Sequence, residues 1–166
     1  MKEGTLRAAA LAIVPAVITT FLIQACGGSS DAVAQSSPPA GDPVEGVWDS
    51  VITARDCTTN AALATFRGMN MLHRGGTVTD TNASPISTRG PGFGTWTRAG
   101  DTYTAKFQFY TYGADGVVTG IRKVTRVFTL SADGNTSNAT NTNELVNLAG
   151  TVIERGCGTD VSTRVR

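Results

Sequence analysis

The segment TYTAKFQFYTYGADGVVTGIRKVTRVFTL, residues 102–130, decides the fold class of this chain. In its first half apolar and polar residues alternate, and this period of two is typical of a strand with one buried face. The apolar positions are Tyr103, Ala105, Phe107 and Phe109. The pattern stops at Asp115-Gly116, a residue pair that favours the tight turn of a hairpin, and then resumes. Residues 102–130 therefore predict two antiparallel strands.

Similar turn signals divide the rest of the domain into runs of strand-forming residues. They are Gly75-Gly76, Gly100-Asp101, Asp133-Gly134 and Ala149-Gly150. No run keeps a helical period, so we predict eight strands near residues 46–56, 62–73, 76–82, 92–99, 101–112, 117–130, 135–148 and 151–165. An open meander of eight strands would expose two edges, so we expect the first strand to pair with the last. The predicted fold is all-β, a single antiparallel up-and-down eight-stranded barrel.

The N-terminal residues resemble the signal of a bacterial lipoprotein. Lys2 and Arg7 precede an almost wholly apolar run over residues 8–23, and a small residue stands directly before Cys26. The resemblance implies that residues 1–25 are a signal peptide containing a signal helix, and that Cys26 is acylated and becomes the mature N-terminus. The apolar run is shorter than the roughly twenty residues that a membrane-spanning helix needs. An ordinary secretory signal cleaved nearby is the alternative.

Two regions follow the signal. Residues 26–44 are rich in Gly, Ser and Pro, which predicts a lipid-anchored flexible tether, and residues 45–166 form the barrel domain. Gly27 stands where an aspartate commonly retains lipoproteins at the inner membrane, so we expect an outer-membrane location facing the periplasm or the cell surface. The chain has 14 Lys and Arg against 13 Asp and Glu, without a basic cluster. This balance predicts no nucleic-acid partner.

The domain also resembles lipocalin-type (calycin) barrels. Gly46-Val47-Trp48 begins the first predicted strand, and Arg164 lies near the end of the last. The resemblance implies that the Trp48 side chain lies across the barrel floor and that Arg164 packs on it. Three further motifs resemble a set of small secreted bacterial calycin-like proteins: Gly75-Gly76-Thr77, Gly94-Thr95-Trp96 and Asp115-Gly116.

Two cysteines remain once Cys26 is acylated, and an even pair in an exported protein predicts a disulfide between Cys57 and Cys157. Facing residues of antiparallel strands have a nearly constant sum of residue numbers. Trp48 with Arg164 gives nearly the same sum as the two cysteines, so both pairs fit a first strand beside the last. Their spacing points Trp48 and Arg164 inwards and the cysteines outwards. Two unpaired, buried cysteines are the alternative.

Strand alternation also predicts the lining of the barrel. The apolar side of residues 102–112 should face the interior. In residues 117–130 the two sides are nearly equally apolar, and the large terminal residues favour an interior side that includes Arg122 and Arg126. Buried guanidinium groups are costly unless carboxylates or a ligand anion pair with them, and the alternative places both at the rim or in solvent. The predicted ligand-binding residues are Tyr103, Phe107, Phe109, Arg122, Val124, Arg126 and Phe128.

The sequence predicts no catalytic residues, cofactor or metal site, because it has no catalytic triad, carboxylate pair or Cys-x-x-Cys, and His73 is its only histidine. We hypothesise a lipid-anchored envelope barrel that binds a small apolar or amphipathic molecule without catalysis. One alternative is an enzyme that acts on a hydrophobic substrate and is similar to allene-oxide-cyclase and dirigent barrels. The other is an envelope interaction module with a filled barrel. A pocket of roughly 300 Å³ or more would exclude the filled barrel. The sequence predicts no oligomeric state.

Overall fold

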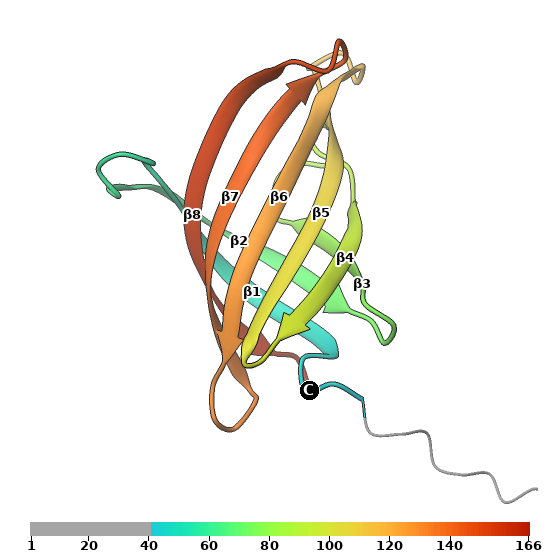
Figure 1. Cartoon of the computed structure of the whole chain (residues 1–166). Helices are drawn as coiled ribbons and strands as arrows, with labels where there is room; N and C mark the ends of the chain where they lie inside the picture. The colour runs from blue at the N-terminus through green and yellow to red at the C-terminus, as the bar shows by residue number, and fades with distance from the viewer. Residues whose placement is uncertain (1–40) are drawn as a thin grey trace, which may run out of the picture. The chain divides into compact units, whose positions relative to one another are not determined.

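The computed structural model describes residues 41–166, which form a closed barrel of eight antiparallel strands (Figure 1). The strands are β1 (Gly46–Arg55), β2 (Ala62–Leu72), β3 (Thr77–Asn82), β4 (Gly92–Ala99), β5 (Thr102–Tyr112), β6 (Val118–Leu130), β7 (Thr136–Asn147) and β8 (Val152–Arg164). The predicted all-β barrel is confirmed, and no predicted strand end differs from the observed one by more than one residue. No helix within the described range is long and apolar enough to cross a membrane. The predicted signal peptide, Cys26 and the tether up to residue 40 lie outside the described residues.

The pairing of β1 with β8 closes the barrel in the register that the sequence predicts. Trp48 faces Arg164 across this pair. Near its other end Cys57 and Cys157, 100 residues apart, form the predicted disulfide with a Cα–Cα distance of 5.2 Å. In the chain-entropy model a disulfide that closes a loop of this length stabilises the fold by at most about 4.7 kcal/mol.

One end of the barrel is filled by an apolar cluster whose largest fully buried side chains include Trp48, Tyr103, Leu72 and Val44. The Trp48 indole donates from Nε1 to the carbonyl oxygen of Val44 at 2.9 Å, and the Arg164 guanidinium lies 4.4 Å from the Trp48 ring centroid. The sequence assigns residues 41–44 to the tether. Val44 is nevertheless fully buried, so the packed segment begins before residue 45. It does so because the backbone of Val44 supplies the acceptor that the buried indole requires.

Candidate functional site

The other half of the barrel contains a cavity of about 660 Å³. Its wall combines polar and charged side chains, such as Arg122 and Glu154, with an apolar set: Ile52, Leu63, Phe66, Phe107, Phe109 and Val124. Its floor is polar and includes Asn70, Asp80, Arg89, Arg126 and Asp160. Small-molecule sites commonly enclose about 300–1,000 Å³ and combine apolar walls with a few polar groups. The cavity therefore has the size and the composition of a ligand site.

The cavity is open because small residues occupy interior positions above the floor. Two of them, Gly156 and Gly158, lie in β8. A Cβ atom on Gly158 would lie 2.8 Å from the carbonyl oxygen of Thr53, and a Cβ atom on Gly156 would lie 2.6 Å from the Asn143 side chain. Ala54, which faces Gly158 in β1, contributes only a methyl group at the same level. No large side chain therefore fills the barrel at this height.

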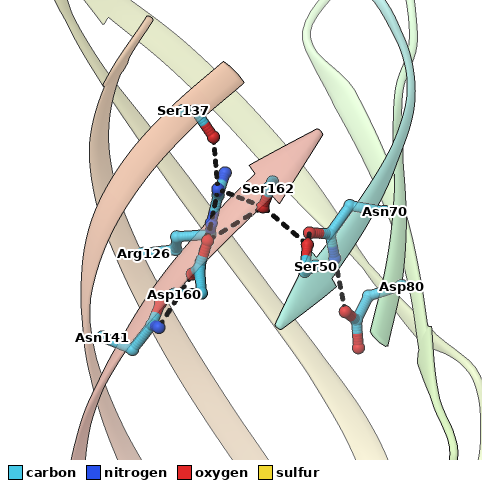
Figure 2. A network of polar contacts seen from close by, with 8 residues as sticks. All are labelled: Ser50, Asn70, Asp80, Arg126, Ser137, Asn141, Asp160 and Ser162. Carbon is cyan, nitrogen blue, oxygen red and sulfur yellow. Dashed lines mark hydrogen bonds and ion pairs between the residues drawn. The ribbon is translucent and has the colours of Figure 1, made fainter. Parts of the chain in front are cut away.

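A buried ion pair between Arg126 of β6 and Asp160 of β8 forms one side of the floor (Figure 2). Nε and Nη2 of Arg126 donate to the two carboxylate oxygens of Asp160 at 2.9 and 2.7 Å. Nη2 also donates to the hydroxyls of Ser137 and Ser162, at 2.9 and 3.0 Å. Asn141 donates to Asp160 at 2.9 Å. Arg126 and Asp160 are each only 4% exposed, so this pairing is what makes their burial tolerable.

The polar floor continues across the barrel to β3 (Figure 2). Ser50 Oγ of β1 lies 2.6 Å from Ser162 Oγ and 3.3 Å from Asn70 Oδ1 of β2. The amide nitrogen of Asn70 then donates to one carboxylate oxygen of Asp80 in β3. Arg89, in the β3–β4 connection, forms an ion pair with the other oxygen of Asp80. A continuous polar network thus separates the apolar closed end from the cavity.

The pKa values of the two carboxylates of this network are shifted in opposite directions. Burial raises the pKa of Asp80 to about 6, even though Arg89 and Asn70 act to lower it. Burial also acts to raise the pKa of Asp160, but the hydrogen bonds and charge of Arg126 outweigh it and hold that pKa below its ordinary value. The difference follows from geometry, because two nitrogens of Arg126 contact Asp160 whereas one nitrogen of Arg89 contacts Asp80.

Arg89 is fixed in position from two sides. Its backbone forms an isolated bridge with Thr111 at the end of β5, and the next residue, Gly90, donates to the carbonyl oxygen of Tyr110 at 2.9 Å. The guanidinium carbon lies 3.8 Å from the ring centroid of Phe109, which is a close cation–π contact. Nε and Nη1 of Arg89 are buried and have no hydrogen-bond partner. Among the described residues, no other buried side-chain nitrogen or oxygen atom lacks a hydrogen-bond partner.

The structure divides the predicted ligand-binding residues into two groups. Those that line the cavity are Phe107, Phe109, Arg122, Val124 and Arg126. Tyr103 and Phe128 instead stack on each other in the closed end, with ring centroids 5.2 Å apart, and both are only 2% exposed. They lie beneath the polar floor. The sequence did not predict this position, because alternation directs a side chain inwards but does not fix its height along the barrel.

The two predicted arginines differ in their surroundings. Arg126 faces the interior, where the carboxylate of Asp160 pairs with it. Of the two partners that the sequence analysis considered for a buried guanidinium, a carboxylate or a ligand anion, the structure contains the first. Arg122 is half-buried and higher on the wall, where Nη1 donates to Asn143 at 2.5 Å and to Glu154 at 3.0 Å. The hydrogen bonds and charge of Arg122 hold the pKa of Glu154 below its ordinary value. Both guanidinium groups therefore already have protein acceptors.

Sequence reasoning missed Asp80, Arg89 and Asp160. A signal existed for Asp160, because it lies four residues before Arg164 in the same strand and must share its interior face. Asp80 lies in the short strand β3, whose six residues carry little apolar alternation. Arg89 lies between strands, where alternation gives no direction to a side chain. Its position was therefore not predictable from the sequence pattern.

A second hollow, of about 870 Å³, lies against strands β4 to β8. Side chains that point away from the interior, including those of Lys106, Gln108 and Lys123, line it and are exposed. The interior cavity is the stronger candidate site, because its polar groups are buried and fixed by one another.

No protein-family model matches the chain, and no curated protein matches it. One solved structure is similar, the "Crystal Structure of Rv2717c from M. tuberculosis". The match has 13% sequence identity and a TM-score of 0.39, and it covers 75% of this chain and 94% of that chain. A match at this level carries no inference about function.

Proposed function

We propose that the protein binds a small amphipathic molecule in the barrel cavity without catalysing its conversion. The observation that carries the proposal is the cavity of about 660 Å³, with its apolar wall above a buried polar floor. Transfer of apolar surface from water to the wall favours binding by roughly 25 cal/mol per Å². The floor supplies the few fixed polar groups that orient a ligand.

A ligand with one polar end fits this arrangement better than a wholly apolar one. The floor carries two arginines and two aspartates, and an apolar group placed against them would remove water without replacing its hydrogen bonds. The wall higher up carries aliphatic and aromatic side chains, such as Ile52, Phe107 and Val124, beside the paired charges of Arg122 and Glu154. We therefore propose that the polar end lies at the floor and the apolar part extends towards the mouth.

We also propose that the protein is a calycin-like lipoprotein of the cell envelope, anchored through acylated Cys26 and located at the outer membrane. The order of residues 1–26 supports the anchor. The Cys57–Cys157 disulfide supports export to an oxidising compartment. The packing of Arg164 on Trp48 supports a calycin-like barrel. Cys26→Ser should abolish partitioning into detergent, and an unchanged mass and partitioning would refute the anchor.

The binding proposal is tested by titrating the mature chain, with Cys26→Ser so that no detergent is needed, with the neutral fluorescent probe N-phenyl-1-naphthylamine. Ala54→Trp places an indole into the cavity and should weaken binding at least tenfold. The matched control is Val51→Trp, which adds the same ring at a position of the same strand that is 41% exposed, and should leave binding unchanged. Absence of binding by the parent chain, or equal effects of the two variants, would refute the proposal.

A complementary measurement identifies the natural ligand. Native mass spectrometry of protein purified from its own host should detect a retained small molecule, and Ala54→Trp should reduce the retained fraction. A barrel that carries no ligand from its host and binds no probe would favour the envelope interaction module.

A further inference from the structure

Arg89 has hydrogen-bond donors that the protein does not satisfy. A guanidinium group has five N–H donors, of which Nε carries one and each terminal nitrogen carries two. Nη2 of Arg89 contacts Asp80, whereas Nε and Nη1 are buried without a partner. Buried donors in native proteins almost always have acceptors, so each exception requires an explanation.

The same cavity contains a second guanidinium, that of Arg126, which makes more hydrogen bonds with the protein. Arg126 uses two nitrogens on Asp160 and two serine hydroxyls as further acceptors. Arg89 has a comparable exposure, 8% against 4%, but a single protein contact to a carboxylate. Arg126 therefore donates four hydrogen bonds within the protein, and Arg89 donates one.

The position of Arg89 suits a ligand that has both a charged and an apolar part. Its guanidinium stacks on Phe109, and both residues line the cavity together with Phe107 and Val124. The backbone bridge to Thr111 fixes the segment that carries Arg89. A ligand whose acceptor group contacts Arg89 would thus place its apolar tail along the aromatic wall, directed towards the mouth of the cavity.

We propose that Arg89 binds the carboxylate of an amphipathic monocarboxylic acid and shares its guanidinium between that carboxylate and Asp80. This proposal rests on the proposed function and specifies the class of ligand. A carboxylate oxygen would accept a charge-assisted hydrogen bond from an unpaired nitrogen of Arg89, and such a bond is stronger than the one that an ester or alcohol oxygen would accept.

Binding of a ligand carboxylate at Arg89 favours protonation of Asp80. The charged groups that face Asp80 are Arg89 and Arg126, and the other charged group of the floor is Asp160. These four groups are balanced when all are ionised, so a ligand carboxylate adds an unbalanced negative charge next to Asp80. Two carboxylates that share one cation favour protonation of one of them. Asp80, with a pKa of about 6, is the group that takes up a proton from solvent.

Proton uptake predicts how affinity depends on pH. Binding raises the pKa of Asp80 above its value of about 6 in the free protein. Affinity for the carboxylate should therefore rise as the pH falls from 8 towards 6, by at most tenfold per pH unit, since one proton is bound with each ligand. A neutral ligand should show no such dependence.

The test compares 11-(dansylamino)undecanoic acid with its methyl ester on the mature Cys26→Ser chain. The parent should bind the acid at least tenfold more tightly than the ester at pH 6. Arg89→Met should remove this preference. Asp80→Asn should act in the opposite direction, tightening acid binding at pH 8 and abolishing its pH dependence, because Arg89 then keeps an unshared charge. Arg67→Met, which breaks the exposed ion pair with Asp49, is the control and should change nothing.

The outcomes separate this inference from the proposed function. Equal affinities for acid and ester would overturn the role of Arg89 and leave the binding barrel intact. Failure of both ligands to bind would overturn the proposed function itself. Weaker acid binding in Asp80→Asn would overturn the sharing of Arg89, since a merely structural pair would lose affinity when either partner is removed. If Arg89→Met does not fold, as judged by circular dichroism, the opposite response of Asp80→Asn still decides the question.

Discussion

Replacing Asp160 by asparagine should lower the free energy of unfolding by about 3–5 kcal/mol, because the change leaves Arg126 charged, buried and without its counter-ion. Asp160 accepts hydrogen bonds from two nitrogens of Arg126, from Asn141 and from Ser162. The asparagine side chain keeps one acceptor oxygen and presents an NH₂ group to the guanidinium donors. For a domain of about 120 residues this loss corresponds to a fall in Tm of roughly 10–25 °C.

The assay is urea unfolding of the mature Cys26→Ser chain at pH 7 with the disulfide intact, followed by tryptophan fluorescence and circular dichroism. The matched control is Asp49→Asn, which breaks the ion pair between Asp49 and Arg67. Their side chains are 34% and 65% exposed, so the control should cost less than about 1 kcal/mol. The difference between the two variants isolates the effect of burial.

Two further measurements test the role of the ion pair between Arg126 and Asp160: the pH dependence of stability and the stability of a double variant. The pKa of Asp160 is lowered, so its stabilising effect is present above an unfolded-state pKa of about 3.9 and is lost as the pH falls through the folded-state pKa. The double variant Arg126→Met with Asp160→Leu removes both charges and should recover most of the stability. The reasoning is refuted if Asp160→Asn costs no more than Asp49→Asn, or if the double variant is less stable than Asp160→Asn.

Three other changes test the remaining parts of the fold. Replacing both Cys57 and Cys157 by serine should lower the free energy of unfolding by at most about 4.7 kcal/mol, and non-reducing peptide mapping of the parent should recover the cross-link; free thiols at both positions would contradict the closure of the barrel. Asp80→Asn should remove the loss of stability that the parent shows as the pH rises from about 4 through about 6, because a carboxyl whose pKa is raised to about 6 loses stability as the pH rises through that value; unfolding curves from pH 4 to 8 in which the parent and the variant run parallel would contradict this. Trp48→Phe removes the hydrogen bond to Val44 and should cost about 1–3 kcal/mol in urea unfolding, whereas an unchanged midpoint would show that this contact does not secure the closed end.

The sequence by itself determined the strands, their order and the closure of the barrel. Alternation with a period of two and the glycine turns are local signals, and they placed the strand ends to within one residue. Closure followed from a second constraint, because Trp48 with Arg164 and Cys57 with Cys157 fit one antiparallel register. Alternation also directed Phe107 and Phe109 to the interior, because it fixes the side of a strand to which each side chain points, but it left Arg126 open between the interior and the rim.

Only the tertiary structure decided what the interior residues contact. Height along the barrel depends on the stagger between strands, so Tyr103 and Phe128 lie in the closed end while Phe107 and Phe109 line the cavity. The carboxylate partner of Arg126 comes from β8, which is distant in sequence. Arg89 lies in a connection where no periodicity applies, and its unpaired nitrogens result from a bridge to β5 and a contact with β3. A local pattern fixes the direction of a side chain, whereas the identity of its partners depends on the packing of several strands at once.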